Sequence, residues 1–191
     1  KIEYTAVGIP NLAATTSPIS GPTLICSSSN STFSLAYRPS ETTVNWTKSS
    51  NLVYISGQGT NNYVVKASSS SGIGTIQATI TPTSGGCGPV TLTYTVWVGT
   101  PVVSVTGPSE GCVNNTYYFA ASPVSSYSNA SNYTWDLAPL NGNYLSPYGY
   151  QNSQCAITFY NPYSASGYWV KARAQNTCGV GTYGQTNIWV H

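Results

Sequence analysis

The sequence carries very little charge. Its 191 residues include six Lys or Arg, four Asp or Glu and one His, for a formal net charge of +2. Nucleic-acid binding needs clustered basic residues, so we expect no nucleic-acid partner. The few candidate acids and bases are spread along the whole chain: Glu3, Glu41, Glu110, Asp136 and His191.

Several motifs of catalysis and ligand binding are also missing. The chain has no phosphate-binding glycine loop with a Lys, no GxSxG elbow and no cluster of acidic calcium ligands. Hydrolysis of a glycoside needs two carboxylates across one bond, and the second half offers only Glu110 and Asp136. We therefore expect a protein that is not an enzyme and has no cofactor or metal.

Long apolar runs are absent too. No segment approaches the ~20 apolar residues of a membrane span, so we expect none in this chain. No basic-then-apolar signal segment begins at Lys1, so we expect the chain to start after a removed leader or inside a larger protein. The five cysteines form no CxxC pair and His191 is the only histidine, which disfavours zinc and favours disulfides in an extracellular compartment.

Alternation with a period of two residues is common in the sequence. In residues 74–82, GTIQATITP, the apolar Ile76, Ala78 and Ile80 alternate with Thr and Gln, and residues 90–98, VTLTYTVWV, behave similarly. Gly, Pro, Asn and Ser bound these segments, as is typical of half-buried antiparallel strands.

The chain contains one pattern twice. ISGPTLIC (19–26) matches VTGPSEGC (105–112), and five later segments of the first half have matching segments in the same order in the second half. The pairs are TFSLAY (32–37) with TYYFAA (116–121), TVNWTK (43–48) with NYTWDL (132–137), NYVVKA (62–67) with QCAITFY (154–160), GTIQATITP (74–82) with GYWVKARAQ (167–175), and YTVWV (94–98) with TNIWV (186–190). A repeat of about 90 residues with about seven strands predicts an all-β chain of two tandem immunoglobulin-like antiparallel β-sandwiches. We place them at residues 17–99 and 100–191, with residues 1–16 as a linker or added strand.

YTWDL at residues 133–137 resembles the core strand of PKD-type domains, and the order GP…C…W…GxGT…CG resembles the PKD-like modules of bacterial secreted and surface proteins. The Gly-Asp-Gly turn of the strict pattern is absent, since APLNGN follows Leu137. The resemblance covers roughly residues 17–191. It implies the sandwich fold and, as family roles, spacing and adhesive display.

Each repeat has an early and a late cysteine. Repeat symmetry pairs Cys26 with Cys87 and Cys112 with Cys178, and the alternative is that all five are reduced core thiols. Cys155 has no partner by symmetry, because Tyr63 stands in its place, so we expect a buried, inert thiol.

The tryptophans fall into two groups. Trp46 and Trp135 lie mid-strand and are expected in the cores, whereas Trp97 precedes the linker and is assigned to interdomain packing. Alternation turns Trp169 and Trp189 outward, facing each other across two strands and flanked by Lys171 and Arg173. They form either a platform for sugars or partner side chains, or a surface covered by a loop or an adjoining domain.

A second candidate is the segment PLNGNYLSPYGYQNS (139–153), read as a Tyr-rich loop that contains Tyr144, Tyr148 and Tyr150. Such loops provide large contact area at low entropic cost. The alternative is that these rings cover a small core.

These observations predict a non-catalytic extracellular module, secreted or at the cell surface. It would be a structural spacer, display or adhesion part of a larger bacterial surface protein. The alternative is a carbohydrate-binding module that uses the exposed Trp and Tyr of the second repeat. The expected partners are neighbouring domains of the same protein and a surface glycan or protein ligand.

Overall fold

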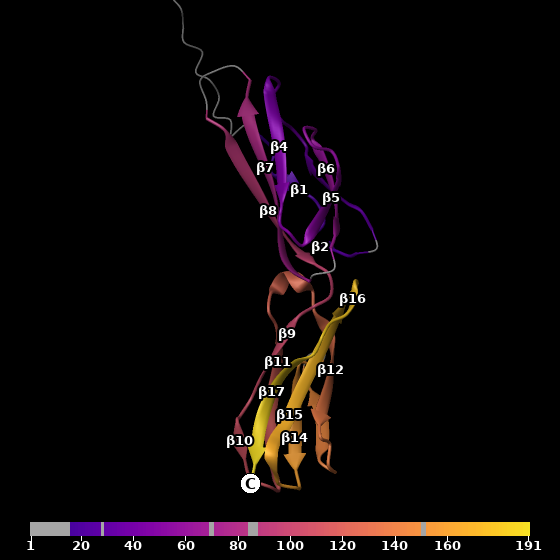
Figure 1. The fold of residues 1–191 in the computed structure, drawn as a ribbon, viewed down its shortest axis with the longest axis vertical. Coiled ribbons are helices and arrows are strands. Elements are labelled where there is room, and N and C mark those ends of the chain that lie inside the picture. The colour runs from indigo at the N-terminus through magenta and orange to yellow at the C-terminus, as the bar shows by residue number, and fades with distance from the viewer. Residues whose placement is uncertain (1–15, 28, 69–70, 84–87, 150–151) are drawn as a thin grey trace, which may run out of the picture. The chain divides into compact units, whose positions relative to one another are not determined.

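The computed structural model describes residues 16–27, 29–68, 71–83, 88–149 and 152–191, whose regular secondary structure is almost wholly β-strand (Figure 1). Within these residues the helical element is one 3-10 turn, η1 (Ser126–Ser128). The chain divides into two compact units, one from Lys1–Ser69 and Ile73–Trp97, the other from Ser70–Gly72 and Val98–His191. The sequence-based limits at 17–99 and 100–191 stay predictions.

The first unit contains two four-stranded sheets. Sheet A has the order β1 (Ile19–Ser20), β3 (Ser31–Leu35), β6 (Asn62–Ala67), β5 (Leu52–Ser56). Sheet B has the order β2 (Leu24–Ile25), β8 (Val90–Val98), β7 (Gly72–Pro82), β4 (Thr42–Lys48).

The second unit also contains two sheets. Sheet C has the order β13 (Tyr144–Tyr148), β14 (Gln154–Phe159), β11 (Asn115–Pro123), β9 (Val103–Thr106). Sheet D has the order β10 (Glu110–Gly111), β17 (Gly184–Val190), β15 (Tyr163–Asn176), β12 (Ser131–Ala138), and β16 (Gly179–Val180) pairs with β15.

The two units repeat one topology strand for strand. Strands β9, β11, β14 and β13 of sheet C follow the order of β1, β3, β6 and β5 in sheet A. Sheet D repeats the order of sheet B, with β16 as an addition. The predicted all-β duplication is confirmed, and each pair of segments matched in the sequence lies on matching strands. The match of TFSLAY with TYYFAA was offset by two residues. Phe33 and Phe119 occupy the same place in the two units, because Phe33 pairs with Tyr63 of β6 and Phe119 pairs with Cys155 of β14.

The repeated Gly-Pro pair marks a close approach to an aromatic ring. A Cβ atom built on Gly21 would overlap the ring of Phe33, and one built on Gly107 would overlap the ring of Phe119. Both rings are buried in the cores. Only glycine leaves room for this packing, which explains why the motif recurs at the start of each sandwich.

The mid-strand tryptophans are core residues, as predicted. Trp46 and Trp135 are 2% and 8% exposed. The Trp46 Nε1 donates to the carbonyl oxygen of Thr60 at 2.8 Å, and the Trp135 Nε1 donates to that of Asn152 at 2.6 Å. Each indole therefore satisfies its one polar group on the backbone just before β6 or β14.

The cysteines differ from the predicted pairing. Cys26 and Cys178 are each disulfide-bonded, whereas Cys112 is an exposed free thiol, so the expected bridge between Cys112 and Cys178 is wrong. Cys87, the expected partner of Cys26, lies outside the described residues.

The topology explains why Cys112 cannot reach Cys178. Strand β10, just before Cys112, pairs with the final residues of β17, Trp189 and Val190, whereas Cys178 precedes the first residue of that strand. The six steps along β17 span about 20 Å. A disulfide needs Cα atoms within about 7 Å.

Candidate binding surfaces of the second unit

The acidic residues of the second unit do not form a catalytic pair. Glu110 and Asp136 lie on β10 and β12, the two edge strands of sheet D, with two strands between them. Three strand spacings are about 14 Å, more than the ~5–9.5 Å that separates the carboxyl groups of glycosidases. Among the described residues, no group of three or more His, Cys, Asp or Glu is placed to hold a metal ion.

The first candidate surface is the outer face of sheet D. The inward residues of β15, Tyr168, Val170 and Ala172, are fully buried. Alternation therefore turns Trp169, Lys171 and Arg173 outward, as predicted. Trp169 and Trp189 are both 40% exposed, so neither is covered within the described part of the chain.

The expected pairing of the two tryptophans across the strands needs a correction. Trp169 lies opposite Asn187, and Trp189 lies opposite Glu110 of the parallel strand β10. Trp169 and Trp189 are thus diagonal neighbours on one face, about 7–8 Å apart at their backbones rather than directly opposed. The hairpin turns between Asn176 and Gly179, earlier than the predicted centre at Gly179, and this shifts the register.

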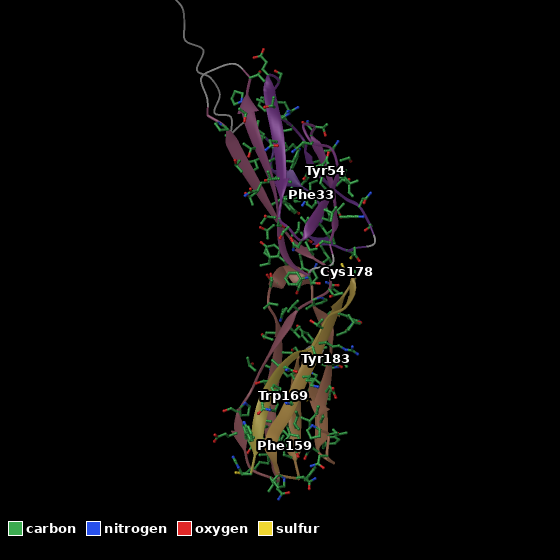
Figure 2. The ribbon with its side chains drawn as sticks, in the orientation of Figure 1. Phe33, Tyr54, Phe159, Trp169, Cys178 and Tyr183 are labelled. Carbon is green, nitrogen blue, oxygen red and sulfur yellow. The ribbon has the colours of Figure 1, made fainter. Side chains whose placement is uncertain are left out.

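Sequence reasoning missed one aromatic residue of this face. The Arg173 guanidinium carbon lies 4.8 Å from the centre of the Tyr183 ring, in cation–π geometry. Tyr183 and Trp169 are labelled in Figure 2. Lys171 lies opposite Asp136 of β12. The face therefore combines Trp, Tyr and Arg with charges of both signs. Tyr183 lies between β16 and β17, outside both strands, where alternation gives no signal.

The second candidate surface is the outer face of sheet C. The segment expected as a loop contains strand β13, which pairs with β14 from Tyr144 to Tyr148. Pro147 is compatible with this strand because β13 is an edge of the sheet. Tyr144 and Tyr148 are 63% and 39% exposed, and Tyr150 lies outside the described residues.

Tyr118 of β11, which sequence reasoning did not single out, joins this surface. Its ring is 62% exposed and meets that of Tyr148 edge to face, with centroids 5.8 Å apart and planes at 80°. Its neighbour Phe119 is buried, so alternation within TYYFAA could have identified Tyr118 as outward. The two candidate sites thus belong to different sheets, and the structure does not combine the tryptophans and the tyrosines into one site.

Cys155 lies beneath the second surface as a buried free thiol, in the place predicted for it. Burial raises the pKa of the Cys155 thiol to about 12, and a backbone hydrogen bond at Ser146 opposes this only in part. A thiol that keeps its proton at neutral pH is a poor nucleophile or metal ligand.

Several solved structures resemble the chain, all at low identity. The full ectodomain of mouse nectin-like molecule 4 matches at 10% identity and a TM-score of 0.48, over 92% of this chain and 65% of that one. The three N-terminal domains of the bacteriophage RB49 outer capsid protein Hoc match at 16% identity and 0.44, over 92% and 59%. The Yersinia pseudotuberculosis adhesin InvE matches at 15% identity and 0.32, over 91% and 58%. The chain therefore spans less than two thirds of the length of each of these three.

No curated protein matches the chain. Among the described residues, no helix is long and apolar enough to cross a bilayer. The family model of the PKD-like domain matches residues 12–96. The match covers most of the first repeat, and the second repeat has the same strand order.

Proposed function

We propose that the chain is a non-catalytic extracellular spacer and display module of a larger bacterial surface protein. The observation that carries this proposal is the parallel pairing of β10 with β17, the first and last strands of sheet D. Because they run in the same direction, the chain enters the second unit at one end and leaves it at the other (Figure 1). Such a unit adds its length to any chain in which it is inserted.

The same pairing resists force applied to the chain ends. Trp189 N donates to the carbonyl oxygen of Ser109, His191 N to that of Gly111, and Val113 N to that of His191. Pulling on the ends loads these parallel bonds together in shear, so no single bond opens first. A spacer at a cell surface requires this property.

A display role also needs a surface for contact with other molecules. The outer face of sheet D has the composition that dominates protein–protein binding energy, namely exposed Trp169, Trp189 and Tyr183 together with Arg173. This supports a protein ligand on that face. The disulfide-bonded state of Cys26 and Cys178 supports an oxidising, extracellular location.

Single-molecule stretching in reductant tests the spacer function. The second unit should unfold in one step that releases about 330 Å of chain. Trp189→Pro removes the N–H donated to Ser109 and should lower the unfolding force of this step, whereas the matched Trp189→Ala keeps that N–H and should not. An unfolding force that Trp189→Pro leaves unchanged would contradict the proposal.

Carbohydrate binding is a second candidate function. The observation that favours it is the group of exposed tyrosines on the outer face of sheet C, which lies apart from the charged face of sheet D.

A further inference from the structure

The outer face of sheet C in the second unit is distinguished by its three exposed tyrosines. Tyr118 projects from β11, and Tyr144 and Tyr148 project from the edge strand β13. Strand β14 lies between β11 and β13. Between them, Ala156 lies opposite both Tyr118 and Ser146. These small neighbours cover little of the rings, which leaves Tyr118 62% and Tyr144 63% exposed.

The first unit shows that the fold does not require these rings. Aligned on the pairs Phe33–Tyr63 and Phe119–Cys155, Thr32 of β3 takes the place of Tyr118, and Val53 of β5 takes that of Tyr144. The same sheet order forms without either ring. Exposed tyrosine rings at these two places in the second unit alone need a reason other than folding.

The chemistry of this face is neutral and rich in hydrogen-bonding groups. Alternation on β11, β14 and β13 gives it hydroxyl and amide side chains and no ionisable cation or carboxylate. The hydroxyl oxygens of Thr116 and Thr158 lie 2.8 Å apart, and Gln154 is an exposed amide residue at the other end of β14. The outer face of sheet D, by contrast, carries Lys171 and Asp136.

We propose that the outer face of sheet C binds a neutral polysaccharide chain through Tyr118, Tyr144 and Tyr148. This inference rests on the carbohydrate-binding function above and assigns it a face and a ligand class. A sugar ring offers C–H groups to an aromatic ring and hydroxyls to amides and phenols, which this face provides together. An anionic glycan would find no cation to pair with here.

The ring geometry narrows the ligand class further. The planes of Tyr118 and Tyr148 are 80° apart, so the two rings present their faces in different directions. A flat crystalline surface cannot stack on both rings, whereas one flexible chain can turn between them. We therefore expect soluble polysaccharides to bind and insoluble crystalline ones not to.

Affinity electrophoresis of the whole chain tests this inference. Native gels would contain dextran, mixed-linkage β-glucan, galactomannan or arabinoxylan as neutral probes, or alginate as an anionic probe. We expect at least one neutral probe to retard the protein and alginate to leave its mobility unchanged. Tyr118→Thr and Tyr144→Val install the residues of the first unit, and each should weaken the affinity about three- to tenfold.

A matched control and three outcomes decide the result. Tyr37→Ser removes a tyrosine of the first unit that is 58% exposed and should leave the retardation unchanged. No retardation by any neutral probe would overturn both this inference and the carbohydrate-binding function. Retardation that persists in Tyr118→Thr and Tyr144→Val, or is lost only in Trp169→Ala, would overturn the assigned face while leaving that function in place.

Discussion

At the scale of single residues, Cys155 shows how duplication frees a position to change. In the first unit, Tyr63 pairs with Phe33 and stacks on Trp46, with ring centroids 5.2 Å apart. In the second unit, Cys155 pairs with Phe119 at the same place and is fully buried. A small polarisable thiol fills a core position without needing a partner.

The two free thiols among the described residues, Cys112 and Cys155, should therefore differ in reactivity. We expect iodoacetamide to modify Cys112 in the native protein and to modify Cys155 only after unfolding, because Cys112 is exposed and Cys155 is buried. Peptide mass mapping of native and denatured samples would measure this. Rapid native modification of Cys155 would contradict it.

The raised pKa of Cys155 gives this comparison a pH dependence. Burial raises the pKa of the folded thiol to about 12, whereas the ordinary pKa of a cysteine thiol is 9.0. Its contribution to stability is therefore complete below about pH 9 and is lost as the pH rises from 9 toward 12. Over that range native Cys155 should stay protected from alkylation while the unfolded thiol reacts at its full rate.

At the scale of strands, alternation predicted most of the fold. In β7, the predicted inward residues Ile76, Ala78 and Ile80 are all fully buried. Strand β13 was missed because its Pro147 and flanking Gly and Asn are typical of loops, and only its place at a sheet edge makes the proline compatible. Alternation predicted the exposed position of Trp189, which is 40% exposed, but Trp97 at the matching place is only 2% exposed, so alternation alone did not determine the environment of Trp97.

Long-range pairing was the part that sequence could not supply. The disulfide prediction assumed that the early and late cysteines of a repeat lie close together. Strand β10 instead runs parallel to β17 and places Cys112 beside the last residues of β17, far from Cys178. The separation of the tyrosines from Trp169 onto different sheets has the same origin. Both depend on which strands are neighbours, and periodicity within a strand does not report this.

Strand β5, an edge of sheet A, exposes three consecutive apolar residues, Val53, Tyr54 and Ile55. An apolar edge with unpaired backbone groups promotes strand-to-strand association. We expect the chain to self-associate as its concentration rises, and Val53→Lys to reduce this. The control Val124→Lys changes a residue that is 61% exposed and outside any edge strand, and should have no effect. Sedimentation velocity over a concentration series would measure it, and equal association of all three proteins would contradict the role of this edge.

At the scale of the whole molecule, the duplicated glycine–phenylalanine contact offers a test of the predicted domain limits. Gly21→Ala and Gly107→Ala each force a methyl group into a buried Phe ring, which costs about 1–3 kcal/mol. If residues 17–99 and 100–191 are separate folding units, each change should speed amide hydrogen exchange only within its own repeat. Gly88→Ala, where an added Cβ meets no atom within 4 Å, should speed it in neither. Exchange followed by mass spectrometry in reductant would measure this, and faster exchange in both repeats from either core change would mean that the two cores unfold as one.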